Sequence, residues 1–507
     1  MKYDLIIFDM DGTLYKMEND PKREFFDNDF FRDIRKNCVD YISRLEGVDI
    51  EKAEQAMQSI IDEYQGEWSK GFIEKYGVDR KEYFSNTWNL DAEKFVGKND
   101  NLRGILNSIS CKKAVLTSAP EVWAENVLDR LNIRDVFDGV WFGDVDIRKP
   151  DKRAYIQVAD ALGVEIGNCL MVEDEERFLL PTKELGMDAV FIGKNKYADY
   201  NIQSIEDITG IVNEKIIIDT DPGHDDALAL MLAAKSKELD IAAVTTVAGN
   251  STIENTTRNA RYILRLLDRE DIPVYSGSER PLKRELVQAV VHGKSGLEGI
   301  DPTNEPKLNG RAVEEISNIA ENNEDITLIT LGPLTNIAKA IKQYPDAMKQ
   351  VKEIVMMGGA VNVPGNKSKY AEFNIFVDPD AADIVFRFPV KKTLVPLDAC
   401  NYVALQLDEF DELKGNRLYE PIIAMMKPYI KNIELDEGTK GALMYDPLTV
   451  FYLLQPETAK VEKYNLKVET KGEKAGKLMI LEGNPNIDVV EYIPKNAFKM
   501  SFLEALK

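Results

Sequence analysis

The sequence predicts an α/β protein made of two domains, each built around a mostly parallel sheet. Two segments, 3–8 (YDLIIF) and 215–218 (KIII), are apolar and β-branched like the first strand of such a sheet, and a cluster of aspartates follows each of them. Short apolar runs separated by helical patterns come after both segments, as in parallel strands joined by crossover helices. A chain of 507 residues is also long enough for more than one hydrophobic core.

The first domain is expected to contain a helical insertion. Residues from about 16 to 98 show helical periodicity with many charged and aromatic side chains. Strand-like runs return at 113–116, 139–142, 169–172 and 189–192, and the polar stretch 196–213 ends in a predicted turn or short helix. These patterns predict a domain of residues 1–213, with a core of 1–15 and 99–213 and a helical cap of about 16–98.

The second domain is expected to cover residues 214–507. Four further runs in it read as buried strands, at 241–246, 327–330, 353–357 and 393–395. Helical patterns separate these runs, so the second domain is also predicted to be α/β.

Composition narrows the classes of function. No apolar run reaches the roughly 18 residues that a membrane span needs, and the opening MKYDLIIFDMDG runs directly into a strand, so we expect a cytoplasmic protein. A formal net charge of -23 disfavours nucleic acid polymers and anionic membranes as partners. The 4 cysteines lack metal-ligand spacing, and with only 2 histidines the chemistry is expected to depend on carboxylates.

Asp9 and Asp11 form the first candidate site. They follow a predicted buried strand, and residues i and i+2 of an extended backbone point to the same side. Ligands of open α/β sheets bind at the carboxyl ends of the strands. Two adjacent carboxylates need a cation or a shared proton, so the pair indicates a hard ion such as Mg²⁺.

The segment D-M-D-G-T-L-Y, residues 9–15, resembles the first motif of the haloacid dehalogenase superfamily of phosphatases, and its opening is similar to the pyrimidine 5′-nucleotidase branch. Further motifs follow predicted strands in the family's order: Thr117-Ser118, Lys149, and Glu173-Asp174. The resemblance covers about residues 1–213 and implies a Rossmann-like core with a helical cap and a bound Mg²⁺ ion.

The same resemblance implies a mechanism. Asp9 would attack phosphorus to form an aspartyl phosphate, and Asp11 would protonate the leaving oxygen and then activate water. Thr117 and Ser118 would bind the phosphoryl oxygens, and Lys149 would offset the negative charge. The implied Mg²⁺ ligands are Asp9, Asp11 and Asp174. In the cap, Tyr64, Trp68, Tyr83 and Trp88 are expected either to stack on a base or to form the core of the cap.

The segment 219–226 (DTDPGHDD) forms the second candidate site. Four carboxylates lie within eight residues, between a predicted strand and an apolar helical pattern. A helix N-terminus can account for one of these acids, but not for all four. Hard oxygen ligands in this density suit Ca²⁺, so the sequence predicts a calcium site.

D-x-D-P-G-x-D-D resembles the signature of the inosine-uridine type nucleoside hydrolases, and the similarity extends over nearly all of residues 214–507. Other motifs of that family follow in order, and each contains a residue for which the resemblance implies a role. They are Val247 to Asn250, His292-Gly293 with Ser295 to Leu297, Leu331 to Asn336, Gly365-Asn366, Ala371 to Ile375, and Tyr445 to Leu448.

Carried over from the family, the calcium ligands would be Asp221, Asp225, Asp226, Asp446 and the carbonyl of Leu331. Asp221 would also take a proton from the water that attacks C1′ of the ribose, as in an inverting glycosidase. Substrate contacts would come from Asn250, His292, Asn366, Glu372, Asn374 and Asp225.

Tyr445 departs from the family, many members of which have a histidine at this position to protonate the departing base. A phenol with a reference pKa of about 10 is a weaker acid than an imidazolium, so purine cleavage is in doubt. His292 could serve as the acid or as a binding group.

Together the two resemblances imply a bifunctional hydrolase that converts a nucleoside monophosphate to a nucleoside and then splits that nucleoside into base and ribose. Two alternatives remain open at this point. The phosphatase could act on an unrelated phosphometabolite, or the second domain could bind nucleosides with little turnover. Small-molecule substrates and a homo-oligomer formed through the second domain are the expected partners.

Overall fold

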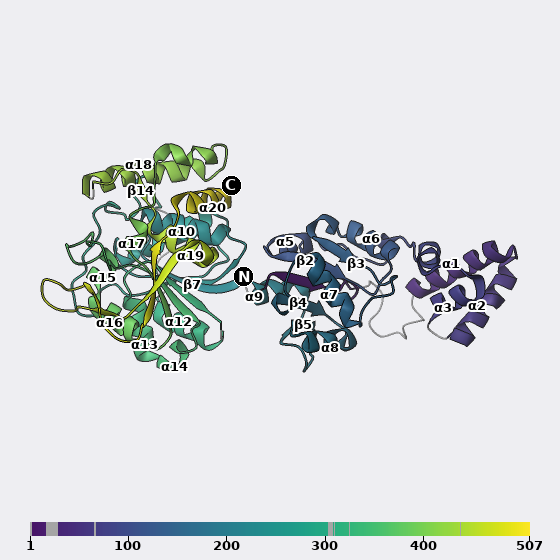
Figure 1. The fold of residues 1–507 in the computed structure, drawn as a ribbon. Coiled ribbons are helices and arrows are strands. Elements are labelled where there is room, and N and C mark those ends of the chain that lie inside the picture. The colour runs from purple at the N-terminus through teal and green to yellow at the C-terminus, as the bar shows by residue number, and fades with distance from the viewer. Residues whose placement is uncertain are drawn as a thin grey trace. The chain divides into compact units, whose positions relative to one another are not determined.

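The computed structural model describes residues 3–16, 29–64, 67–302, 308, 310–323, 325–436 and 438–507. The chain divides into two compact units, Met1–Asn213 and Glu214–Lys507, and each is described by itself. Both units combine a mainly parallel sheet with helices, which confirms the predicted α/β fold class (Figure 1).

Unit 1 contains a six-stranded sheet in the order β3-β2-β1-β4-β5-β6, with every neighbouring pair parallel. The first strand lies in the middle, so that Phe8 at its end pairs with both Val115 and Val172. The sequence predicted five of these strands and missed β6, a three-residue strand within the polar stretch 196–213. The strands are β1 Leu5–Phe8, β2 Lys112–Leu116, β3 Gly139–Trp141, β4 Cys169–Glu173, β5 Asp188–Ile192 and β6 Tyr200–Ile202.

Alternate residues of β1 pack against opposite layers of unit 1. Ile6 and Phe8 belong to a core that includes Trp123 of α6 (Glu121–Arg130), whereas Leu5 and Ile7 pack with Tyr155 of α7 (Lys152–Ala161). This division follows from the period of two in a strand. The remaining core helices are α5 Leu102–Asn107, α8 Glu176–Leu185 and α9 Thr209–Val212.

Four helices occupy much of the predicted insertion. They pack against one another through a core that contains Ile42, Met57, Phe72 and Tyr83. Residues 17–28 and 65–66 of the predicted cap lie outside the described residues. The four helices are α1 Asp29–Glu46, α2 Ile50–Tyr64, α3 Trp68–Tyr76 and α4 Arg80–Thr87.

Unit 2 contains an eight-stranded sheet in the order β15-β18-β12-β11-β10-β7-β8-β9. Only the pair β15 and β18 is antiparallel among the pairs in this sheet that the structure describes. The sequence missed β9, β15 and β18; β15 (KVEKY) is a largely exposed edge strand with no buried residue. The strands are β7 Glu214–Thr220, β8 Leu239–Thr246, β9 Val274–Ser276, β10 Thr327–Thr330, β11 Glu353–Met357, β12 Lys391–Val395, β15 Lys460–Tyr464 and β18 Ile487–Tyr492.

Helices cover both faces of this sheet (Figure 1). One layer packs on Ile216 and Ile218 and includes α10 His224–Lys235, α11 Ile253–Leu266, α18 Tyr419–Asp436, α19 Tyr445–Leu454 and α20 Lys495–Leu506. The other packs on Ile217 and includes α12 Ala312–Glu321, α13 Thr335–Gln343, α14 Pro345–Met348 and α16 Pro379–Arg387. Helix α10 is buried from His224 to Ala234, so it lies at the centre of its layer.

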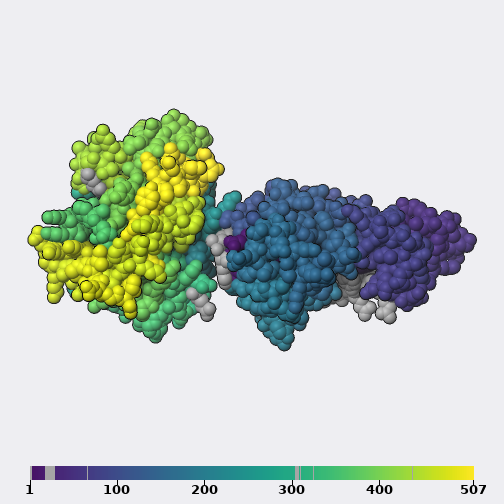
Figure 2. Space-filling view, viewed as in Figure 1, coloured from purple at the N-terminus to yellow at the C-terminus, as the bar shows by residue number. Residues whose placement is uncertain are grey.

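Smaller elements complete unit 2. A hairpin of β16 (Leu466–Val468) and β17 (Leu478–Ile480) packs on α16, and β13 (Ala404–Leu405) pairs with β14 (Ala442–Leu443). The short helices α15 (Phe373–Val377) and α17 (Leu397–Cys400) follow β11 and β12 along the chain. Figure 2 shows that the yellow C-terminal part of the chain forms a broad area of the visible surface of this unit. Among the helices that the structure describes, none is long and apolar enough to cross a lipid bilayer.

Candidate functional sites

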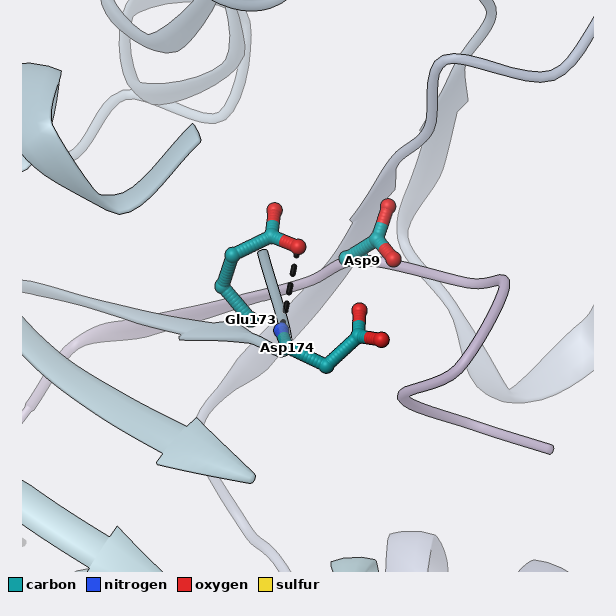
Figure 3. Close-up of side chains that lie close together, drawn as sticks. All are labelled: Asp9, Glu173 and Asp174. Atoms are coloured by element: carbon teal, nitrogen blue, oxygen red, sulfur yellow. Dashed lines mark hydrogen bonds between the residues drawn. The ribbon is translucent and has the colours of Figure 1, made fainter. Parts of the chain in front are cut away.

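The first candidate site lies at the carboxyl ends of β1 and β4, where a crevice is expected in an open α/β sheet. Asp9, Glu173 and Asp174 each bring one carboxylate oxygen to within 4.8 Å of the other two (Figure 3). Lys149 is buried beside them, and its Nζ donates to Asp9 Oδ1 at 2.5 Å and to Glu173 Oε2 at 2.8 Å. Three acids therefore converge with a single ammonium group.

Burial shapes the protonation of this cluster. Burial raises the pKa of Asp9, although the nearby Lys149 acts in the opposite direction. Burial also raises the pKa values of Glu173 and Asp174, and the charge of Asp9 adds to both of these shifts. Buried carboxylates of this kind become fully ionised only when a cation offsets their charge. The donor set of hard oxygens fits a divalent ion such as Mg²⁺.

Asp11 lies outside this group of three acids. Its carboxylate accepts hydrogen bonds from the hydroxyl of Tyr15, from Trp123 Nε1 at 3.3 Å and from Thr117 Oγ1 at 3.4 Å. Burial, followed by the charge of Asp9, raises the pKa of Asp11 to about 6. The sequence grouped Asp11 with the metal ligands, but the structure gives its side chain a different set of partners. The sequence analysis gave Tyr15 no role within its motif and did not identify Trp123.

The two residues predicted to bind phosphate follow β2. Thr117 is buried, and its Oγ1 accepts the N–H of Ala119 at 3.0 Å, whereas Ser118 is exposed. Both residues precede α6, and Thr117 contacts Asp11 as described above. Hence Lys149 contacts Asp9 and Thr117 contacts Asp11, so two later motifs of the sequence reach the end of β1.

The cap contains a cavity of about 460 Å³. Trp68, Tyr83 and Trp88 line it, together with Arg148, the neighbour of Lys149. Tyr64 is not among the lining residues, and its hydroxyl donates to Glu74. Tyr83 is 2% exposed and belongs to the cap core, and it also reaches the cavity wall, so stacking on a base stays a prediction for this residue.

The second candidate site lies in unit 2 at the carboxyl end of β7. Asp219 is the buried next-to-last residue of this strand and accepts hydrogen bonds from Thr245 Oγ1 at 2.6 Å and from Asn336 Nδ2 at 2.8 Å. Burial raises the pKa of Asp219 to about 7. The Asp219 side chain thus links β7 to β8 and to α13, just before the acids 221–226 in the sequence.

Asp225, Asp226 and Asp446 bring one carboxylate oxygen each to within 4.8 Å of one another. Asp226 is held by the hydroxyl of Thr220 at 2.5 Å, the N–H of Gly223 at 3.0 Å and Asn250 Nδ2 at 2.9 Å. Asp446 comes from the first turn of α19, far away in the sequence. The fold therefore brings together acids that the sequence placed in two separate motifs.

Asp221 lies against this group in a confined position. Its Oδ2 accepts the N–H of Asn250 at 2.6 Å. A Cβ atom on Gly249 would lie 2.1 Å from Asp221 Oδ2, and one on Gly332 would lie 2.4 Å from Asp221 Oδ1. Only glycine at these two positions leaves room for the carboxylate.

Two oxygens of these acids show that the residues fit a bound cation. Asp221 Oδ1 and Asp446 Oδ1 are buried and receive no hydrogen bond from any residue that the structure describes. Burial, together with the neighbouring acids, raises the pKa values of Asp221 and Asp446. Orphaned buried carboxylate oxygens call for a proton or a metal ion, and hard oxygen donors suit Ca²⁺.

A cavity of about 100 Å³ opens beside this acidic group. Residues from every predicted nucleoside-binding motif line it: Asn250, His292, Leu331, Asn366, Glu372, Asn374 and Tyr445. Asp225 and Asp446 face the cavity, whereas Asp221 and Asp226 are not among its lining residues. Met357, Lys367, Tyr429 and Asp436 also line it and lie outside the predicted motifs, and Phe373 lines it from within the motif Ala371 to Ile375.

Glu372 and Asn374 are fixed by the local backbone. The carboxylate of Glu372 caps α15 by accepting the N–H groups of Asn374 at 2.7 Å and Ile375 at 3.1 Å, and it also accepts that of Gly359 at 2.8 Å. Asn374 Nδ2 donates to the carbonyl of Leu331 at 2.7 Å. The Leu331 carbonyl, which is predicted to be a calcium ligand, thus already accepts a hydrogen bond from Asn374 of the predicted ribose-binding motif.

His224 and His292, the 2 histidines of the chain, stack with Tyr429 beside the cavity. Burial lowers the pKa of His224 to about 4. Burial and the neighbouring His224 ring together hold the pKa of His292 well below its usual value. His292 Nε2 lies 3.8 Å from Asp225 Oδ1. The sequence assigned His224 no role, and no pattern in the sequence places it beside His292.

Comparison with known proteins gives two family matches. The model of the inosine-uridine preferring nucleoside hydrolases matches residues 216–500, and that of the haloacid dehalogenase-like hydrolases matches residues 3–177. An uncharacterized protein of Schizosaccharomyces pombe is 42% identical over 267 residues, which are 51% of this chain and 86% of that protein. The pyrimidine-specific ribonucleoside hydrolase RihA of Escherichia coli is 38% identical over 307 residues, covering 58% of this chain and 98% of RihA. A solved plant nucleoside hydrolase has a TM-score of 0.55 at 30% identity and covers 58% of this chain and 98% of its own.

Proposed function

Since the chain belongs to the inosine-uridine preferring nucleoside hydrolases through residues 216–500 and carries a haloacid dehalogenase-like hydrolase region, we propose that it is a bifunctional hydrolase. Residues 1–213 act as a phosphatase on a nucleoside monophosphate. Residues 214–507 hydrolyse the N-glycosidic bond of a ribonucleoside to give base and ribose.

One observation carries this proposal. Each unit has its own group of three acids whose oxygens lie within 4.8 Å of one another. Asp9, which follows β1, belongs to the first group, and Asp221, which follows β7, lies beside the second. Two complete acidic sites in one chain support two separate metal-assisted reactions.

In unit 1, Asp9 is the nucleophile that forms an aspartyl phosphate, and Lys149 offsets the negative charge of the nucleophile and the phosphoryl group. Asp11 retains a proton to about pH 6, so it can protonate the leaving oxygen and then accept a proton from the attacking water. Thr117 and Ser118 bind the phosphoryl oxygens. Asp9 and Asp174, with Glu173 beside them, would hold Mg²⁺, which neutralises charge on the phosphoryl group when bound.

In unit 2, Asp221 accepts the proton of the water that attacks C1′. Its Oδ1 receives no hydrogen bond from the residues that the structure describes, which supports a role in binding a proton or the ion. Asp221, Asp225, Asp226, Asp446 and the Leu331 carbonyl would hold Ca²⁺, which polarises water and orients the ribose hydroxyls when bound. Asn250, Asn366, Glu372 and Asn374 position the nucleoside.

We propose that the base is a pyrimidine. Burial holds both His224 and His292 neutral, so the site offers no imidazolium to the leaving group. Tyr445 lines the cavity and can donate its phenol proton instead. The similarity to RihA, which is named a pyrimidine-specific ribonucleoside hydrolase, supports the same choice. Association of residues 214–507 into a homo-oligomer is proposed from the resemblance to the family.

A substrate screen tests the proposal. The purified chain, supplied with Mg²⁺ and Ca²⁺, is incubated with the common ribonucleosides and their monophosphates while phosphate and free base are followed separately. We expect phosphate from a pyrimidine monophosphate and free base from the matching nucleoside. Phosphate from unrelated phosphate esters alone would contradict the nucleotide assignment, and nucleoside binding without release of base would contradict the hydrolase assignment.

A further inference from the structure

Four lysines gather around two aromatic rings of unit 2, Tyr370 and Phe373, and the second of these rings lines the cavity. The Nζ atoms of Lys369, Lys474 and Lys477 each lie 5.8 Å from the centroid of the Tyr370 ring. Lys367 Nζ lies 5.6 Å from the centroid of the Phe373 ring. Cations at this distance are attracted to the ring faces, which holds the ammonium groups near one another.

The lysines come from two segments that pack directly together. Lys367 and Lys369 belong to the loop between β11 and α15, and Lys474 and Lys477 belong to the turn between β16 and β17. A Cβ atom on Gly476 would lie 2.8 Å from the Cβ of Ala371, so the turn touches the loop with no space for a side chain. The two backbone segments that carry the four lysines are therefore held together by the fold.

The ammonium groups lack anionic partners. Within the described part of the chain, none of the four forms an ion pair or a side-chain hydrogen bond. Other lysines of the same unit are paired, such as Lys352 with Glu214 at 2.7 Å and Lys391 with Glu353 at 2.8 Å. Four uncompensated cations are notable in a chain with a net charge of -23, and they favour an anionic ligand.

The lysine group adjoins the nucleoside cavity. Lys367 and Phe373 line that cavity, and Lys367 follows Asn366, whose Oδ1 accepts the N–H of Phe373 at 3.1 Å. This step rests on the proposed function: the acidic group holds the 2′ and 3′ hydroxyls, and the base lies beside His292. The remaining end of the ribose, its 5′ carbon, then extends along Asn366 toward the lysines.

We propose that the lysine group, defined by Lys367, Lys369, Lys474 and Lys477, binds the 5′-phosphate of a ribonucleoside monophosphate. Unit 2 then hydrolyses the nucleotide directly to base and ribose 5-phosphate. Water forms the new C1′–O bond, the C1′–N bond breaks with its electron pair on the base, and the base nitrogen gains a proton, so the reaction involves no change of oxidation state. The phosphatase unit is consequently not required to act first, and ribose 5-phosphate is a second candidate substrate for it.

The test uses the full-length Asp9→Asn protein with Ca²⁺, so that the phosphatase cannot prepare the nucleoside. It is given either a pyrimidine nucleoside or the corresponding 5′-monophosphate, and base, ribose and ribose 5-phosphate are measured. We expect base from both compounds and ribose 5-phosphate from the second. Base from the nucleoside alone would overturn the phosphate site while leaving the proposed function intact, whereas base from neither would contradict the proposed function itself.

A set of charge variants identifies the source of phosphate recognition. The triple variant Lys369→Gln/Lys474→Gln/Lys477→Gln is expected to raise KM for the monophosphate about tenfold or more and to leave nucleoside hydrolysis unchanged, because charge-assisted contacts to phosphate are strong. The matched control changes three exposed lysines elsewhere in unit 2, Lys342→Gln/Lys349→Gln/Lys463→Gln. Equal loss in both triple variants would show a general effect of net charge and overturn the site.

Inhibition gives a readout that does not depend on turnover of the nucleotide. Ribose 5-phosphate is expected to inhibit nucleoside hydrolysis more strongly than ribose does, and the difference is expected to shrink in the lysine triple variant and at high salt. The measurement uses the Asp9→Asn protein, so that the phosphatase unit cannot convert ribose 5-phosphate to ribose, and equal inhibition by the two sugars in that protein would contradict the proposal.

Discussion

The Nδ1 atoms of His224 and His292 lie 3.1 Å apart in the buried stack beside the cavity. The carbonyl of Glu298 can only accept, so His224 Nε2 at 2.9 Å carries hydrogen. Because burial keeps both rings neutral, Nδ1 of His224 is then an acceptor. His292 Nδ1 is within reach of this acceptor and, at 3.2 Å, of the backbone N–H of His224, so both polar contacts that orient the His292 ring on this side come from His224.

The first prediction concerns this pair. His224→Gln retains a donor near the Glu298 carbonyl and is expected to keep most nucleoside hydrolysis, whereas His224→Ala frees the His292 ring to rotate and is expected to lower kcat about tenfold. The measurement is kcat and KM for a pyrimidine nucleoside in both variants. Equal loss in the two variants, accompanied by equal loss of thermal stability, would indicate a packing role alone.

The second prediction concerns metal and pH together. Buried Asp219 has a pKa of about 7, and those of Asp221 and Asp446 are also raised, so the folded metal-free protein holds protons that the unfolded chain releases near pH 4. The metal-free protein is therefore expected to lose stability as pH rises from about 4 through these raised values. Ca²⁺ is expected to raise Tm more at pH 8 than at pH 5.

The dependence of Tm on pH and Ca²⁺ is measured by thermal unfolding with and without Ca²⁺ at pH 5 and pH 8. The Asp446→Asn variant is the control. This variant removes one of the mutually repelling acids, so it is expected to unfold at a higher temperature than the wild type without metal at pH 8, and to respond less to Ca²⁺. A Ca²⁺ response unaffected by Asp446→Asn would contradict the assignment of the ligands.

The third prediction concerns Asp11. Its pKa of about 6 keeps the carboxyl protonated in mildly acidic solution. If Asp11 protonates the leaving oxygen, formation of the aspartyl phosphate slows above about pH 6, and Asp11→Asn loses this pH dependence along with about 10²-fold or more of the rate. Single-turnover kinetics across pH 5 to 8 provide the measurement, and a pH-independent first step in the wild type would contradict the role.

The fourth prediction concerns Tyr445, which lines the nucleoside cavity at the start of α19. Tyr445→Phe is expected to lower kcat for pyrimidine nucleosides about tenfold to 10²-fold with little change in KM, because the phenol acts on the leaving group. Tyr445→His is expected to increase purine nucleoside cleavage relative to the wild type. Full activity of Tyr445→Phe would remove the phenol from the mechanism and leave His292 as the donor.

The sequence predicted the α/β class and the buried strands well because those strands are continuous apolar runs, as β7 and β11 show. It missed β9, which has three residues, and β15, whose sequence KVEKY contains three charged residues and reads as a polar loop. Edge strands carry little burial signal, so periodicity alone does not reveal them.

Motifs explain why so many predicted site residues line one cavity, from Asn250 to Tyr445. The residues that were missed make contacts through the tertiary fold. Trp123 reaches Asp11 from α6, and Tyr429 completes the histidine stack from α18, yet each has the local sequence of an ordinary buried helical residue. Nothing in their spacing points to a site.

The central claim is that two independent carboxylate sites carry out two different hydrolyses. The most direct measurement follows inorganic phosphate from a pyrimidine 5′-monophosphate and free base from the matching nucleoside, in the wild type, Asp9→Asn and Asp221→Asn. The account predicts that Asp9→Asn abolishes phosphate release and retains nucleoside cleavage, and that Asp221→Asn does the reverse. Loss of both activities in either variant, or persistence of base release in Asp221→Asn, would contradict it.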